Sequence, residues 1–94
     1  MIVRFSSKET KLIFYGYTSR VYPPDIQKIA LRKLLILDAA ASVDDLRIPP
    51  GNRLEKLAGD RKGQYSIRIN SQWRICFTWT AENNADQVEI VDYH

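Results

Sequence analysis

Residues 64–79 read QYSIRINSQWRICFTW, and this stretch decides the fold class. Apolar and aromatic residues occupy every second position on both sides of the polar pair Asn70-Ser71. This alternation predicts two antiparallel strands, over residues 65–69 and 73–79, joined by a tight turn. We expect their apolar side chains to pack on helices, whereas Arg68 and Arg74 would share the opposite, open face of the sheet.

The elements around this hairpin follow from shorter patterns. Ser6 and Glu9 have the spacing of a capping box and predict a helix start. Pro23-Pro24 precedes a stripe of apolar residues at helical spacing, which predicts a second, longer helix. In chain order, the further predicted elements are a strand over 2–5, helices over 7–15 and 24–41, a short strand over 54–57 and a last strand over 88–91.

This β-α-α-β-β-β-β order, with short loops, predicts an α+β fold. Its sheet is expected to be twisted and mainly antiparallel, with both N-terminal helices on one face. A chain of 94 residues is expected to form a single domain over 1–94.

Several classes of protein are excluded by composition. Four scattered glycines fit neither a dinucleotide-binding nor a Walker loop. One histidine and one cysteine, Cys76, cannot build a metal cluster, so no metal or cofactor is expected. No apolar stretch approaches the ~20 residues of a membrane span, and a cytoplasmic location is expected.

Basic residues gather in one part of the chain. The net charge is +3, and residues 47–74 contain seven Lys and Arg residues against two acidic ones. Such a segment suits contacts with nucleic-acid phosphates, although an ordinary solvated basic surface is equally compatible with it. The candidate contacts to RNA and the ribosome are Arg53, Lys56, Arg61, Lys62 and Arg68.

Four motifs occur together in the second half of the chain. They are LEKLAGDRKG at 54–63, QYSI at 64–67, WRICF at 73–77 and DYH at 92–94. This set resembles the HigB-type toxins, a "plasmid maintenance system killer" group of the RelE/ParE superfamily, including its GraT branch. The resemblance spans about residues 24–94, and the β-α-α start agrees with it in outline.

The resemblance implies a toxin of a type II toxin–antitoxin system that cleaves mRNA on the ribosome without a metal and so inhibits translation and growth. It also implies a separate HigA-type helix-turn-helix antitoxin. Operator DNA would be bound only through the toxin–antitoxin complex, and no membrane is involved. By matching motifs, Arg74, Asp92, Tyr93 and His94 correspond to the family's active-site positions.

Two positions depart from the family pattern. Glu55 stands where these toxins have a histidine, and Ala58 stands where they have a lysine just before Gly-Asp-Arg. Glu55 is either a catalytic base or a surface charge that pairs with Arg53 or Lys56. Arg68 either holds a neighbouring phosphate or is solvated.

Each active-site residue has a chemical role that its side chain allows. His94 can accept or donate a proton near neutral pH, and Arg74 can hold a phosphate in bidentate fashion. Tyr93 can stack on a base or donate a proton, and Asp92 can orient His94 or act itself. Two alternatives stay open: a ParE-like toxin that inhibits gyrase, and a weakened relative that only binds its antitoxin. Leu31 and Leu35, on one flank of the long helix, are the candidate antitoxin surface.

Overall fold

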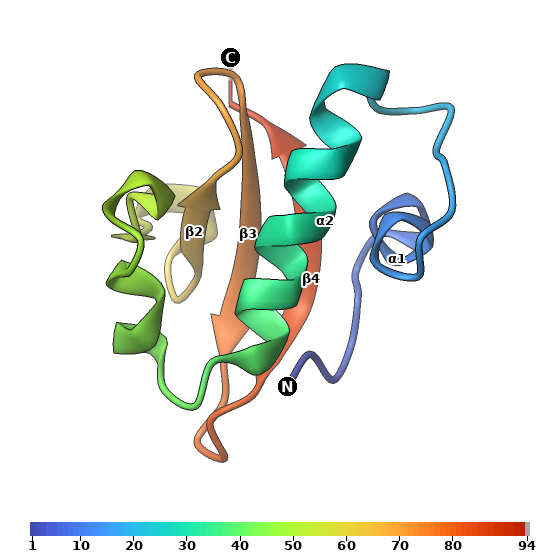
Figure 1. Cartoon of the computed structure of the whole chain (residues 1–94). Coiled ribbons are helices and arrows are strands. Elements are labelled where there is room, and N and C mark those ends of the chain that lie inside the picture. Colours follow the sequence, from blue (N-terminus) through green and yellow to red (C-terminus); the bar gives the residue numbers. More distant parts are fainter. Residues whose placement is uncertain (94) are drawn as a thin grey trace.

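The computed structural model describes residues 1–93. Two helices precede a four-stranded antiparallel sheet of strand order β1-β2-β3-β4. Helix α2 crosses one face of the sheet, and α1 lies beside α2 near β4 (Figure 1). The α+β prediction is therefore confirmed. The elements are α1 Lys8–Phe14, α2 Pro24–Ala39, β1 Glu55–Lys56, β2 Tyr65–Arg68, β3 Trp73–Trp79 and β4 Ala85–Asp92, with 3₁₀ turns at Val43–Arg47, Pro50–Asn52 and Gly59–Arg61.

The β2–β3 hairpin forms in the predicted register. Tyr65 lies opposite Phe77, and Ile67 lies opposite Ile75. The alternating apolar side chains of both strands belong to one core, to which α2 also contributes. Side chains one position out of phase must then point to the other face of the sheet, because successive residues of a strand alternate. The completely buried residues of this core include Ile67, Ile75 and Phe77 of the sheet and Ala30, Leu34 and Leu37 of α2.

The strand predicted over residues 2–5 forms only in part. Ile2 and Phe5 make isolated parallel bridges to Ala85 and Val88 of β4. Between these bridges Gln87 adopts a left-handed conformation with φ of 51°, which interrupts the regular ladder along β4. The N-terminal segment therefore lies along β4 without forming a continuous strand.

Helix α1 starts one residue later than predicted. The N-cap is Ser7, whose hydroxyl accepts a 3.2 Å hydrogen bond from the amide of Thr10. The predicted capping box of Ser6 and Glu9 is wrong, because the Glu9 carboxylate accepts from the Ser19 hydroxyl at 2.7 Å instead. The buried hydroxyl of Thr10 in turn accepts from the amide of Ile90 at 3.0 Å. Helix α1 thereby supplies a hydrogen-bond acceptor to a backbone amide of β4.

A buried asparagine fixes the connection between α2 and β1. The side chain of Asn52 donates to the carbonyl oxygens of Leu46, at 3.1 Å, and Ile48, at 3.3 Å. Its own oxygen accepts a 2.5 Å hydrogen bond from Lys33 of α2, and partial burial lowers the pKa of this lysine. This connection leads the chain to the face of the sheet that the helices leave open.

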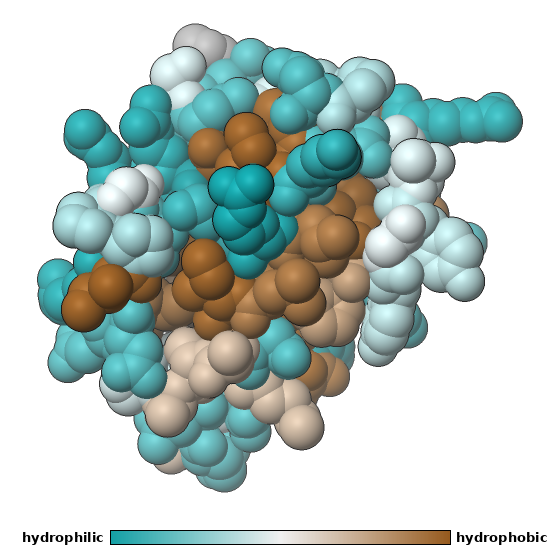
Figure 2. All heavy atoms as spheres, viewed as in Figure 1, coloured by the Kyte–Doolittle hydropathy of each residue, from teal (hydrophilic) through white to brown (hydrophobic). Residues whose placement is uncertain are grey.

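Figure 2 shows hydrophobic side chains between hydrophilic ones on the face of the molecule that α2 occupies in Figure 1. Leu35 is 51% exposed, whereas Leu31 is half-buried and packs against the core. Within residues 1–93, neither helix has the length and apolar character required to cross a membrane.

Candidate active site

Arg74 lies on β3 and points away from the helices. Its side chain is only 8% exposed. Its Nε donates a 2.8 Å hydrogen bond to the hydroxyl of Ser66 on β2, and Nη2 donates a 2.6 Å hydrogen bond to the carbonyl oxygen of Arg53. The prediction of an open sheet face is therefore wrong at Arg74, because the segment before β1 covers the guanidinium.

The backbone of Arg53 explains how this cover forms. Arg53 adopts a left-handed conformation, with φ of 45° and ψ of 56°, directly after the Pro50–Asn52 turn. This conformation is uncommon for residues other than glycine and costs on the order of 1–3 kcal/mol. It accompanies the carbonyl contact with Arg74, while the Arg53 side chain stays exposed. Arg53 thus takes part in the site through its backbone.

Two further residues border the guanidinium on its exposed side. Glu55 Oε1 lies 3.6 Å from Arg74 Nη1, and the glutamate side chain is 53% exposed. The ring centre of Tyr93 lies 5.4 Å from the guanidinium carbon, in the arrangement of a cation–π contact. One hypothesis for Glu55 was a surface charge that pairs with Arg53 or Lys56. The predicted partners are wrong, since the carboxylate pairs with Arg74.

Arg68 is the direct cross-strand partner of Arg74. Their side chains share the face opposite the helices, where two like charges at paired positions are unfavourable. Arg68 is half-buried, and within residues 1–93 it has no ion pair with a carboxylate. A bound anion would relieve this repulsion, so the pair suits a phosphate.

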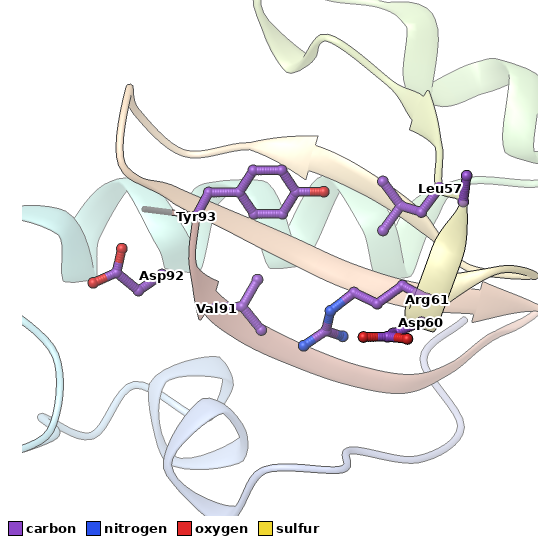
Figure 3. A pocket seen from close by; sticks show the side chains of 7 residues that line it. Leu57, Asp60, Arg61, Val91, Asp92 and Tyr93 are labelled. Carbon is purple, nitrogen blue, oxygen red and sulfur yellow. The ribbon is translucent and has the colours of Figure 1, made fainter.

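A hollow of about 410 Å³ opens next to this cluster (Figure 3). It lies between the Gly59–Arg61 turn and the end of β4. Ala58, at the position of the family's lysine, adds no cation to it. Its lining residues are Leu57, Ala58, Asp60, Arg61, Val91, Asp92 and Tyr93.

Some of the predicted RNA-contacting residues are already ion-paired within the protein, whereas others are exposed to solvent. Arg61 donates to Glu89 at 3.0 Å and to Gln64 at 2.9 Å, so its charge is already paired. Arg53, Lys56 and Lys62 are exposed. The structure therefore leaves these three cations solvated and holds Arg61 as part of the wall of the hollow.

The last predicted site residues are held through Gln72, just before β3. Gln72 donates from its side chain to Asp92 at 3.0 Å and accepts from the amide of Tyr93 at 2.7 Å. These contacts place Tyr93 at the rim of the hollow. His94 lies outside the described residues, and its role stays a prediction.

Sequence reasoning missed three contributors to the site: Ser66, Gln72 and the Arg53 carbonyl group. Ser66 was detectable, because it alternates out of the core beside Arg74 in the hairpin register. The carbonyl contact depends on an irregular turn that has no periodic signal. Cys76 is completely buried on the same face as Arg74, and burial raises the pKa of its thiol, which makes it unreactive.

Comparison with known families decides what kind of protein carries this site. Residues 4–94 match the family described as the RelE-like toxin of the type II toxin–antitoxin system HigB. The chain belongs to this HigB-like toxin family. The prediction of a HigB-type toxin is therefore confirmed, and with it an antitoxin as partner.

Three relatives show how far the HigB-like sequence extends. Toxin HigB-1 of Vibrio cholerae is 55% identical over 60 residues, which cover 64% of this chain but only 63% of that toxin. An uncharacterized protein of Haemophilus influenzae is 38% identical over 80 residues, covering 85% of this chain and 77% of the relative. Endoribonuclease HigB of Proteus vulgaris is 36% identical over 95 residues and is covered completely, as is this chain. The chain is thus a full-length homologue of an endoribonuclease.

Solved structures confirm the fold of this HigB-like chain. A chain of the YoeB–YefM complex from Staphylococcus aureus matches with a TM-score of 0.57 and 20% identity. A chain of the heterotetrameric YoeB–YefM complex from the same organism gives 0.60 and 18%. Both matches cover 100% of this chain and 98% of the other.

Proposed function

We propose that this HigB-like toxin is a ribosome-dependent mRNA endonuclease, with Arg74 at the centre of its active site. The observation that supports this most is the fixed position of the Arg74 guanidinium beneath Tyr93, beside the hollow. Ser66 and the Arg53 carbonyl orient the cation before any substrate arrives. A preorganised cation stabilises charge that develops on a phosphate more effectively than one that must reorient.

The proposed reaction uses the RNA's own 2′-hydroxyl and needs no metal or cofactor. The 2′-oxygen attacks the adjacent phosphorus while the bond between this phosphorus and the 5′-oxygen of the next nucleotide breaks. The products are a cyclic phosphate and a free 5′-hydroxyl. One group must accept the 2′-hydroxyl proton and another must protonate the leaving oxygen. His94 suits either role, because the ordinary pKa of a histidine side chain is about 6.5.

Asp92 and Tyr93 support this chemistry from the end of β4. Asp92 orients His94 or transfers a proton itself. Tyr93 stacks on a base at the rim of the hollow or donates a proton through its hydroxyl. Arg68, paired across the strands with Arg74, holds a neighbouring phosphate.

Glu55 occupies the side of Arg74 that a phosphate would approach. Its carboxylate lies 3.6 Å from Nη1, so a bound phosphate must share or displace this contact. Glu55 then either accepts the 2′-hydroxyl proton or acts as an internal anion that gives way to substrate. Both roles predict measurable changes when the carboxylate is replaced by an amide.

Ribosome dependence follows from the openness of the site. A surface hollow offers too few contacts to order single-stranded RNA on its own, whereas the ribosome presents mRNA already positioned. The exposed cations Arg53, Lys56 and Lys62, with the half-buried Arg61 and Arg68, would dock on ribosomal RNA.

The antitoxin of this system is proposed to be a separate HigA-type helix-turn-helix protein, and operator DNA to be bound only through the complex. The family's toxin–antitoxin character supports this partner. The chains of similar fold also come from toxin–antitoxin complexes. The toxin itself would act in the cytoplasm, where the ribosomes are.

The deciding experiment combines purified toxin, ribosomes and one mRNA, with cleavage mapped by primer extension. We expect cleavage with ribosomes and none without them. Arg74→Lys, which keeps the charge but loses the bidentate geometry, should abolish it. Gyrase inhibition by the same preparation, without mRNA cleavage, would overturn the proposal in favour of a ParE-like toxin.

A further inference from the structure

We propose that Asn52 is a positioning residue for the active-site arginine. It holds the backbone of Arg53 in the conformation that aims the Arg53 carbonyl oxygen at the guanidinium of Arg74. This inference deepens the proposed function and rests on it, since it takes Arg74 as the group that binds the phosphate. It adds a buried residue that acts on Arg74 through the backbone of its neighbour.

One of the groups that orient Arg74 belongs to the backbone. Its Nη2 donates to the carbonyl oxygen of Arg53 at 2.6 Å. A carbonyl oxygen has no rotamers, so its position follows from the φ and ψ angles of the chain around it. Arg53 has φ of 45° and ψ of 56°, a left-handed conformation that residues with a Cβ atom rarely adopt. The surroundings of Arg53, and not its own preference, must therefore hold the chain in this conformation.

Asn52 is the buried residue of an otherwise exposed segment. Residues 47–51 and Arg53 are exposed, whereas Asn52 is completely buried. The backbone amides of Asn52 and Arg53 donate to the carbonyl oxygens of Pro49 and Pro50, at 2.9 and 3.1 Å. These two hydrogen bonds close the turn that leads into the left-handed residue. The side chain of Asn52 is thus the point at which this turn is fixed to the interior of the protein.

The partners of this side chain explain why it is an asparagine. Its nitrogen donates to the carbonyl oxygens of Leu46 and Ile48, and its oxygen accepts from the ammonium group of Lys33 on α2. An ammonium group only donates and a carbonyl oxygen only accepts, so a neutral amide satisfies both sides at once. The reversed amide would set donor against donor and acceptor against acceptor. Asn52 therefore ties the turn to α2 and to the buried Leu46 in a single arrangement.

A matched pair of variants tests whether the backbone conformation of Arg53 matters. Arg53→Gly and Arg53→Val lose the same exposed cation, so any change in ribosome affinity should be common to both. Glycine adopts the left-handed conformation readily, whereas a β-branched residue strongly disfavours it. At saturating ribosomes, mRNA turnover by Arg53→Val should therefore be about ten- to a hundredfold lower than by Arg53→Gly. Equal turnover by the two variants would overturn the inference.

Asn52→Asp tests the buried side chain at almost unchanged shape. An ionised aspartate still accepts from Lys33 but cannot donate to the two carbonyl groups, so the turn should shift. Hydrogen exchange of the Arg74 side chain, followed by NMR in the full chain, reports this shift without requiring catalysis. The Nη2 protons should exchange about tenfold faster, because they lose the Arg53 carbonyl oxygen, whereas the Nε proton stays protected by Ser66. Unchanged Nη2 exchange, or equally faster exchange at both nitrogens, would refute the proposal.

The control is a destabilising substitution away from this turn. Ile13 of α1 is buried, and α1 packs against α2 and β4, whereas the Pro50–Asn52 turn packs against β2 (Figure 1). Ile13→Ala should therefore lower the thermal stability but keep the Nη2 exchange and the mRNA turnover of the wild type. Faster Nη2 exchange in Ile13→Ala as well would show that general stability, and not Asn52, holds Arg74 in place.

The two measurements separate this inference from the proposed function. Faster Nη2 exchange in Asn52→Asp, together with no mRNA cleavage by the wild type, would keep Asn52 as the residue that positions Arg74 and overturn the nuclease. Cleavage by the wild type, with equal turnover by the two Arg53 variants, would leave the nuclease standing and overturn the positioning role of Asn52.

Discussion

The Nε atom of Arg74 donates a 2.8 Å hydrogen bond to the hydroxyl of Ser66, and both residues are buried on the sheet face opposite the helices. The two side chains come from neighbouring strands, β3 and β2. A buried charged donor needs such partners, because leaving it without them costs the full desolvation of the charge. The orientation of Arg74 is therefore set by the sheet register as much as by its own sequence position.

The first prediction concerns this contact. Ser66→Ala removes the hydroxyl but creates little empty space, so the chain should stay folded with a loss of about 1–3 kcal/mol. Turnover of mRNA at saturating ribosomes should fall about tenfold, because the guanidinium of Arg74 is no longer held in its orientation. The affinity for the ribosome should stay constant. Ser71→Ala, in the exposed turn before β3, is the control and should behave as wild type. Equal turnover in both variants would show that Ser66 does not position Arg74.

The second prediction concerns the buried Asn52. Asn52→Ala should lower the free energy of unfolding by about 2–4 kcal/mol, since it strands the carbonyl groups of Leu46 and Ile48 and the ammonium group of Lys33. Urea denaturation followed by circular dichroism measures this. Lys33→Ala should cost less, because Asn52 keeps both carbonyl contacts. The reverse order would contradict the account of this connection.

The hairpin at the centre of the sheet was predictable from sequence, and the reason is physical. Strands buried on one face must alternate apolar and polar residues. The alternation over residues 65–69 and 73–79 therefore predicts both the strands and which of their side chains are buried. The strand over 2–5 was predicted too simply. Its partner β4 contains the left-handed Gln87, and no pattern in the sequence marks a non-glycine residue for that conformation.

The candidate site divides in the same way. The motifs selected Arg74, Glu55 and Tyr93, and the structure brings these three together. The burial of Arg74 was not predictable, because it depends on a second left-handed residue, Arg53, which turns an irregular segment over the sheet. Local periodicity reports which face a residue occupies but not which loop covers that face.

The third prediction concerns the exposed cations. Lys56→Ala with Lys62→Ala should weaken ribosome binding and reduce its dependence on salt, since fewer counterions are released. Both side chains are exposed, so stability should change by less than about 0.5 kcal/mol per substitution. Arg61 is left intact, because it also holds Glu89. Unchanged co-sedimentation with ribosomes at moderate salt would mean that these lysines are only solvated.

The fourth prediction concerns the outer side of α2. Leu35→Asp should abolish complex formation with the antitoxin on a sizing column but keep toxicity, because Leu35 is 51% exposed and lies on the helical side of the sheet. Leu31→Asp is unsuitable for this test, since Leu31 packs against the core and its charge would destabilise the fold. An intact complex with Leu35→Asp would place the antitoxin on another surface.

The last prediction decides which residue, Glu55 or His94, transfers the proton during mRNA cleavage. His94→Ala should reduce mRNA cleavage by about 10²–10⁴, the usual contribution of a general acid or base. Glu55→Gln should keep cleavage within about tenfold and tighten phosphate binding, because it removes the anion 3.6 Å from Arg74 Nη1. Single-turnover rates on ribosome-bound mRNA measure the first effect, and titration with inorganic phosphate measures the second. Near-complete loss of cleavage in Glu55→Gln, with His94→Ala still active, would instead make Glu55 the base. Full cleavage activity in both variants would overturn the assignment of proton transfer to either residue, because neither proton acceptor would then be needed.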